Sequence, residues 1–371
     1  MRFLSYLCDL DPRGLDSKYK SLVGSLLGVY FFISSIVLIK SSAVRMGEFL
    51  AGKIILLIRD TTSGVFAGWI ATALLHSSGA FDSIIVAFVS SGVIPMSLAV
   101  ATIIGAEIGT TVTPLLVSTI GYIRKKAQLS ASFNVTMVHF LYNLFTFLIF
   151  YTAELFFGVF TYIAQAGSSI FVKATWLRYI PSLLDIATPW VDPLLGLIPP
   201  WIGLILGGAT LILSLWCLEQ YMTALFSMPK SWSLIRATFT KPLRAFAAGF
   251  LFTLLVPSTS VMVSLLVPLA ASGVIRADYY ILPYILGANI GTVFDVMIAA
   301  LATGDPVSLG VWLVHLTINV IGAVIFFPLL KPFSRLTRWS SEMLTRSQRR
   351  TLLFIGVFHA LPILIMLIYF I

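Results

Sequence analysis

Long apolar runs limit what this chain can become. Five of them are almost free of charge over lengths that can cross a bilayer: 21–39, 133–160, 194–228, 308–330 and 351–371. A membrane-spanning helix needs about 20 predominantly apolar residues. In the whole chain 11% of the residues are charged, against roughly a quarter in a soluble domain. We therefore predict an all-α polytopic membrane protein, with no cleavable signal before its first helix.

Two further apolar regions, 61–123 and 245–302, are interrupted by Gly, Pro, Ser and Thr. An unpaired backbone group in lipid costs several kcal/mol, so broken helices persist only where protein or a watery cavity covers them. Such segments at matching places in two halves are the best sequence indicator of a transporter's binding site.

Four motifs recur in the same order in the two halves. The first half has Leu75-His76-Ser77-Ser78, Ser90-Ser91-Gly92, Gly105-Ala106-Glu107-Ile108-Gly109-Thr110-Thr111 and His139 followed by Asn143. The second half has Pro257-Ser258-Thr259-Ser260, Ala271-Ser272-Gly273, Gly287-Ala288-Asn289-Ile290-Gly291-Thr292-Val293 and His315 followed by Asn319. Chance similarity of apolar segments would give one such match, not four, so we infer an internal duplication.

The basic residues indicate that the two repeats have opposite orientations. The loop after the first glycine motif holds Arg124-Lys125-Lys126, whereas the charge in its counterpart, 302–307, is Asp305. The segment 331–350 is strongly basic, and the loop at its equivalent place in the first half is not. Basic loops mark the cytoplasmic side of a membrane. Equivalent loops thus fall on opposite sides.

These features divide the chain into six parts. They are a cytoplasmic N-terminal segment, 1–20; a first inverted repeat, 21–160; a connecting segment, 161–193; a second inverted repeat, 194–330; a basic cytoplasmic linker, 331–350; and a terminal transmembrane helix, 351–371. Each repeat is expected to hold a re-entrant helical hairpin and a broken transmembrane helix. The charges from Lys40 to Arg59 would fall outside, a conflict that an interfacial helix over 43–59 would remove.

In the order of these motifs the chain resembles the type II sodium–phosphate cotransporter family. Each repeat of that family has a Gln-Ser-Ser-Ser motif, a Ser-Gly hinge and a Gly-x-Asn-Ile-Gly-Thr motif, followed by a His and an Asn. The resemblance runs from about residue 34 to the end. It implies a sodium-coupled symporter of inorganic phosphate in the plasma (inner) membrane. It also implies sodium as the metal, no cofactor, no enzymatic activity and no nucleic-acid partner, and it leaves a homodimer open.

The chain departs from that family pattern at the expected site. His76 and Pro257 replace the two Gln residues, Gly79 replaces the third serine, Glu107 replaces an Asn, and Asp82 and Asp295 add carboxylates. Three carboxylates are gained and three amides are lost. A proton- or sodium-coupled carrier of another oxyanion, or of another small or even cationic solute, is therefore the first alternative.

Phosphate inside a membrane must exchange its water for hydroxyl and backbone N–H donors. The two apparent chain reversals supply both, and we predict that they bind the substrate through His76, Ser77, Ser78, Ser258, Thr259 and Ser260. Small hydroxyl residues also let helices pack closely, and that explanation would suffice for one isolated pair. Because a pair of hydroxyl residues occurs at both breaks, substrate binding is favoured over close helix packing.

A coupling sodium ion would need a cage of oxygens, from the carbonyls of an unwound helix together with Thr110, Thr111, Asn289 and Thr292. Carboxylates inside a membrane must be paired, hydrated or protonated. Asp82, Glu107 and Asp295 are therefore candidates for sodium or proton coupling, with an internal salt bridge as the alternative. His139, Asn143, His315 and Asn319 are expected to be polar links that support the hairpins.

Two other classes of function remain open. Re-entrant segments also occur in ion channels, but the chain has no visible ring-forming filter motif. An intramembrane hydrolase would need a nucleophile such as Ser77 with a base such as His139. Replacing Ser77 and measuring both hydrolysis and uptake would separate a hydrolase from a carrier.

Overall fold

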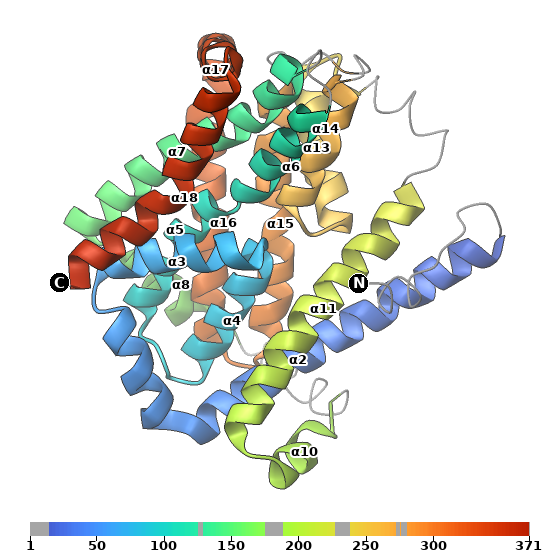
Figure 1. The fold of residues 1–371 in the computed structure, drawn as a ribbon. Coiled ribbons are helices and arrows are strands. Elements are labelled where there is room, and N and C mark those ends of the chain that lie inside the picture. The colour runs from blue at the N-terminus through green and yellow to red at the C-terminus, as the bar shows by residue number, and fades with distance from the viewer. Residues whose placement is uncertain are drawn as a thin grey trace.

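The computed structural model describes residues 15–124, 129–174, 188–226, 238–271, 275 and 280–370. All regular structure within these ranges is helical (Figure 1). Seven described segments are long and apolar enough to cross a membrane: Val23–Gly47, Met96–Thr119, Ala131–Phe157, Pro200–Cys217, Ile281–Ala302, Pro306–Thr345 and Gln348–Tyr369. The predicted all-α polytopic fold is confirmed. Lys125, Lys126 and the hinge residues Ser272 and Gly273 lie outside the described residues.

The first long helix changes direction within its length. Helix α2 (Leu15–Leu57) has a left-handed residue at Gly47, where φ is 43° and ψ is −122°. An ordinary side chain rarely adopts that conformation. The helix continues from this kink to Leu57, so most of the predicted helix over 43–59 exists. Its interfacial position stays a prediction.

Two pairs of short helices occur at the predicted breaks, one helix of each pair before the break and one after it. Helices α3 (Thr61–Leu75) and α4 (Ser78–Ser90) have 15 and 13 residues, and α13 (Pro242–Leu255) and α14 (Thr259–Ala271) have 14 and 13. At 1.5 Å per residue each is about 20 Å long, too short for a hydrocarbon layer of about 30 Å. These lengths fit the predicted re-entrant hairpins.

The remaining described elements of the first half are α5 (Met96–Gly109), α6 (Val112–Arg124), α7 (Leu129–Phe157) and α8 (Val159–Lys173). Those of the second half are α10 (Val191–Leu197), α11 (Pro200–Phe226), α15 (Ile281–Ala302), η3 (Pro306–Ser308), α16 (Leu309–Phe326), η4 (Phe327–Leu329), α17 (Leu330–Thr345) and α18 (Gln348–Phe370). The predicted basic linker is thus largely helical. The α15–α16 connection and α17 lie at opposite ends of the molecule (Figure 1).

Within each half, a glycine lets two helices pack with their backbones in contact, and the two contacts occur at matching places. A Cβ atom added at Gly105 on α5 would overlap the Val65 carbonyl oxygen on α3, and one added at Gly287 on α15 would overlap the Phe246 carbonyl oxygen on α13. These residues occupy equivalent places in the two motif series. Equal packing of the α3–α5 and α13–α15 pairs is what a duplicated segment would produce. The opposite orientation of the halves stays a prediction.

The predicted break in the transmembrane helix occurs in the first half and not in the second. Helix α5 ends at Gly109 and α6 begins at Val112, but α15 runs unbroken through its glycine motif. The difference follows from Pro114, whose equivalent in the second half is Val296. Proline lacks an N–H and its ring clashes with the carbonyl four residues earlier. The prediction of a broken transmembrane helix in the second repeat is therefore wrong for α15.

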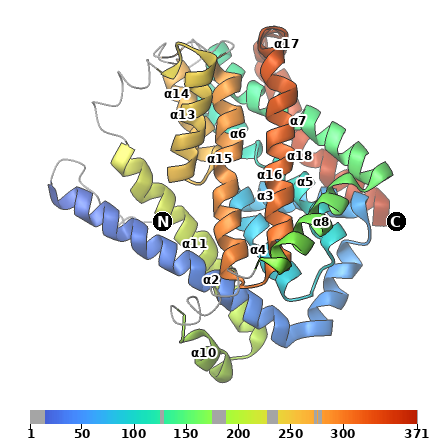
Figure 2. The same ribbon diagram turned by 180° about the vertical axis from the view of Figure 1, so that it is seen from behind.

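Each short helix pair packs against the other half of the chain. Helix α4 lies against α15, α14 lies against α6 and α7, and α16 lies against α5. Figure 2 shows α15 and α16 from behind, with α4 beside them. The two halves therefore interlock around one shared centre.

Candidate functional site

The two short helices that follow the breaks begin in the same way. The Ala80 amide donates to Ser77 Oγ over 3.2 Å, and the Val261 amide donates to Ser258 Oγ over 3.3 Å. Each serine thus caps its helix, which explains why the sequence starts a new helix there. The first amides of a helix have no carbonyl partner within it. Both hairpin tips therefore present hydroxyls and unsatisfied helical N–H groups.

Both tips meet the break between α5 and α6. His76 Nδ1 at the first tip is 3.1 Å from Thr113 Oγ1, and Ser260 Oγ at the second tip donates to the Thr110 carbonyl oxygen over 2.9 Å. That carbonyl cannot receive a helical hydrogen bond, because Pro114 has no N–H. The break in α5–α6 therefore provides the acceptor that holds the second tip.

His76 has an unusual backbone conformation and remains accessible. Its φ is 57° and ψ is 18°, and within the described residues it is the one non-glycine residue with positive φ. It is exposed, whereas Ser78, Ser258, Thr259 and Ser260 are buried. The predicted substrate residues therefore lie at the two tips, with His76 exposed and the others buried or partly buried.

Helix α15 contacts both tips on the side away from the α5–α6 break. Thr259 Oγ1 donates to the Ala288 carbonyl oxygen over 3.2 Å. A Cβ atom at Gly79 would overlap Asp295 Oδ2. Asp295 therefore occupies the space that a third serine would take in the first tip. Two departures from the family pattern, at positions 79 and 295, are parts of one local arrangement.

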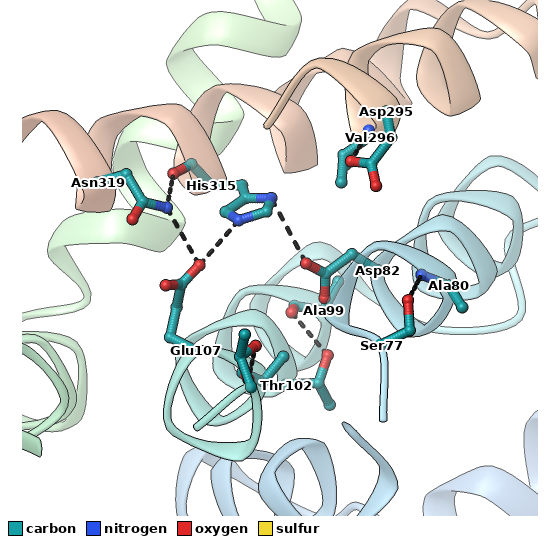
Figure 3. A network of polar contacts seen from close by, with 12 residues as sticks. Ser77, Ala80, Asp82, Ala99, Thr102, Glu107, Asp295, Val296, His315 and Asn319 are labelled. Carbon is teal, nitrogen blue, oxygen red and sulfur yellow. Dashed lines mark hydrogen bonds and ion pairs between the residues drawn. The ribbon is translucent and has the colours of Figure 1, made fainter. Parts of the chain in front are cut away.

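One buried and one partly buried carboxylate converge on one histidine (Figure 3). Glu107 Oε1 on α5 is 2.8 Å from His315 Nε2 on α16, and Asp82 Oδ2 on α4 is 3.4 Å from His315 Nδ1. Side-chain exposure is 1% for Asp82 and His315 and 14% for Glu107. Asn319 Nδ2 also donates to Glu107 Oε1, over 3.1 Å. We call Asp82, Glu107 and His315 the acid–histidine cluster.

The cluster gives the two acids an internal partner that the sequence did not indicate. The sequence predicts structural support for His315 and Asn319, because no local pattern shows which helix meets which motif. The duplication is the one sequence feature that could have indicated the contact. In a molecule whose halves interlock, the glycine motif of one half meets the histidine helix of the other.

The equivalent place in the other half carries no acid. Asn289 stands where Glu107 stands, and its side-chain Nδ2 has no hydrogen-bond partner among the described residues. Neither ring nitrogen of His139 has a hydrogen-bond partner among the described residues, while Asn143 Nδ2 donates to the His139 carbonyl oxygen over 2.9 Å. The acid–histidine contact therefore exists at one of the two places where a glycine motif faces a histidine helix.

The predicted sodium candidates lie around the break and along α15. Thr110 Oγ1 and Thr111 Oγ1 donate to carbonyl oxygens of α5 over 3.0 and 2.7 Å, which leaves their lone pairs as acceptors. Thr292 and Asn289 are buried on α15. Among the described residues, no three His, Cys, Asp or Glu side chains are placed to hold a metal ion together.

Comparison with known proteins points to one family. The family model described as Na+/Pi-cotransporter matches residues 31–171 and 210–356. Sodium-dependent phosphate transport protein 2A of Rattus norvegicus is 25% identical over 389 residues, which cover 83% of this chain and 60% of the relative. Sodium-dependent phosphate transport protein 2B of Homo sapiens is 25% identical over 413 residues, covering 84% and 59%. The chain thus spans about 60% of the length of these curated relatives. No solved structure matches it.

Proposed function

The chain belongs to the Na+/Pi-cotransporter family, and on this premise we propose that it is a sodium-coupled symporter of inorganic phosphate that works by alternating access. Its seven candidate spans make it an integral membrane protein. The observation that carries the proposal is the meeting of two serine-capped hairpin tips at one helix break. That arrangement serves transport of a small anion rather than catalysis.

Phosphate is held between the two tips in this proposal. The donors are the imidazole of His76, the hydroxyls of Ser77, Ser78 and Ser258, and the first-turn amides of both tips. Thr259 and Ser260 donate to the substrate when their hydroxyls leave the Ala288 and Thr110 carbonyl oxygens. An anion at a helix N-terminus is stabilised by free N–H groups and by the helix dipole. Two such termini facing one site would hold an oxyanion by several donors without a lysine or arginine. Among the described residues, the buried ones include neither.

Sodium supplies the positive charge that this site lacks. Thr110, Thr111, Asn289 and Thr292 offer hydroxyl, amide and nearby carbonyl oxygens, the ligand type that alkali and other hard cations prefer. The carboxylates of Asp82, Glu107 and Asp295 make the centre negative before any phosphate arrives. The anion is therefore repelled until cations enter, and bound cations in turn favour the anion, which is the reciprocity that coupling requires.

The proposed orientation follows from charge. The N-terminal segment, the end of α6 and the basic helix α17 lie on the cytoplasmic side, in a plasma (inner) membrane. The two inverted repeats, 21–160 and 194–330, would exchange access by moving relative to one another. A proton-coupled carrier of another small anion is the second candidate, and the acid–histidine cluster favours it.

Uptake of radiolabelled phosphate into proteoliposomes tests this function. We expect uptake under an inward sodium gradient and none when choline replaces sodium. Ser77→Ala and Ser258→Ala should each lower uptake about tenfold or more, since a hydrogen bond to a charged group contributes about 1.5–3 kcal/mol. Ser169→Ala is the control, because that exposed hydroxyl donates to its own helix at Ala166.

Two results would count against the proposal. Folded protein that takes up no phosphate under a sodium gradient excludes sodium–phosphate symport. Uptake driven by a proton gradient alone would instead favour the second candidate. Thermal unfolding of each variant separates a lost helix cap, about 1 kcal/mol, from a lost substrate contact.

A further inference from the structure

The two contacts of the acid–histidine cluster require a specific number of protons. Each contact brings a carboxylate oxygen within ion-pair distance of a ring nitrogen of His315. Neither ring nitrogen is aligned for a hydrogen bond, so the attraction is between charges and needs a proton on the imidazole or on one of the acids. A neutral imidazole has one N–H and can satisfy one carboxylate. The other ring nitrogen would then turn its lone pair toward the second carboxylate. The geometry therefore holds one proton more than a neutral histidine with two ionised acids.

No other described group relieves this requirement. Asp295 on α15 acts electrostatically on both Asp82 and His315 and adds a further acid. Tyr142 on α7 faces Glu107 and is a neutral phenol in its ordinary state. Asn319 donates to the same oxygen, Glu107 Oε1, that faces the ring. Of the described residues, no lysine or arginine is buried in this region.

We propose that Asp82, Glu107 and His315 form a proton-binding site, and that it is loaded in the conformation described here. The extra proton lies on the imidazole or on one of the two acids, and either placement removes the repulsion between a ring lone pair and an ionised acid. The ring nitrogens face Glu107 Oε1 and Asp82 Oδ2.

The site joins the two halves of the molecule. Asp82 and Glu107 belong to α4 and α5 of the first half, and His315 belongs to α16 of the second. Loss of the proton leaves a lone pair against a buried carboxylate, which favours separation of α16 from α4 or α5. Loading the proton therefore stabilises this arrangement of the halves, and a ligand shifts a conformational equilibrium by its preference for one state. This role in the transport cycle rests on the proposed function, but proton binding itself does not.

The Glu107→Gln variant removes one of the two acids that share the proton. The glutamine side-chain oxygen still accepts from Asn319, so the glutamine NH2 group does not face His315 Nε2. One negative charge fewer lies beside the imidazole, and the extra proton is held less tightly. Glu154→Gln is the matched control, because Glu154 is 5% exposed, accepts from the Phe160 amide over 2.8 Å and lies outside the cluster.

The first measurement is phosphate uptake at a fixed sodium gradient, with equal pH on both sides, from about pH 6 to about pH 8. The rate of each variant is divided by that of the parent chain, so changes in phosphate ionisation cancel. One linked proton changes an equilibrium by up to roughly tenfold per pH unit. We expect the Glu107→Gln ratio to change by about tenfold over the range, and the Glu154→Gln ratio to stay constant.

The second measurement is the thermal unfolding midpoint of the purified protein over the same pH range. A proton held by the folded state and released on unfolding lowers stability as the pH rises. The parent chain and Glu154→Gln should share this slope, and Glu107→Gln should have a shallower one. A flat uptake ratio together with equal unfolding slopes would overturn the proton site. If the parent chain takes up no phosphate at any pH, the proposed function fails and the unfolding slopes alone decide this site.

Discussion

At the scale of single residues, the site shows how one substitution makes room for another. Gly79 has no side chain, and the carboxylate of Asp295 fills the space beside it. The first tip thus has one hydroxyl fewer, and α15 has one charge more. A negative group at this place repels an anion directly and attracts a cation. Gly79 and Asp295 together therefore favour a cation near the first tip. The second tip keeps three hydroxyl residues, Ser258, Thr259 and Ser260.

A double-mutant cycle tests this pairing. Gly79→Ser should destabilise the protein by about 1–3 kcal/mol, the usual penalty for overpacking. Asp295→Ala removes the obstructing carboxylate, so in its presence Gly79→Ser should have little effect on stability. Thermal unfolding of the two single variants and the double variant gives the interaction energy. Additive effects would mean that the two side chains do not share this space.

At the scale of helices, one proline decides where a span is interrupted. Pro114 leaves the Thr110 carbonyl oxygen without a helical donor, and Ser260 of the other half donates to it. Val296 imposes no such restriction, and α15 stays continuous. The break is therefore a contact point between the halves as well as an interruption of α5–α6.

Pro114→Ala should close the break. The new N–H can bond the Thr110 carbonyl oxygen, and Ser260 then loses its acceptor. We expect the fold to persist and phosphate uptake to fall roughly fivefold, the equivalent of one hydrogen bond of about 1 kcal/mol. Pro242→Ala is the control, since a proline in the first turn of α13 removes an N–H that has no helical partner anyway. Unchanged uptake in Pro114→Ala would argue against a role for the break.

The glycine contacts between helices give a stability prediction. In Gly105→Ala the new methyl group would collide with the Val65 carbonyl oxygen, and in Gly287→Ala with the Phe246 carbonyl oxygen. Backbone atoms cannot rotate away as a side chain can, so each change should destabilise by more than about 1 kcal/mol. Gly208→Ala on α11 is the control, because nothing lies within 4 Å of its added Cβ atom. Melting temperatures of purified variants would show the difference.

At the scale of the whole molecule, the sequence predicted the helices and the repeated motifs better than the contacts between them. Apolar runs, the proline and the serine caps act locally, so the sequence reveals them. The partnership of His315 with Asp82 and Glu107 depends on packing between helices far apart in the chain, and no local signal encodes it. The sequence could have predicted that only the first half has a broken helix, because Pro114 acts on its own helix and its equivalent, Val296, does not.

The opposite orientation of the repeats can be tested by labelling. Cysteines would replace Lys125, Asp305 and Arg338 singly in a chain whose Cys8 and Cys217 are changed to serine. A membrane-impermeant maleimide added to intact cells should reach position 305, whereas positions 125 and 338 should need permeabilised cells. Labelling of positions 125 and 305 from the same side would contradict inversion.

The interlocking of the halves also affects how the protein is made. Helix α4 lies against α15, and His315 on α16 faces acids on α4 and α5. A ribosome completes the first half well before either partner helix exists. Until then Asp82 and Glu107 have no imidazole beside them and must remain hydrated or protonated. The first hairpin therefore reaches its final packing only after α15 and α16, in the last third of the chain, have been synthesised.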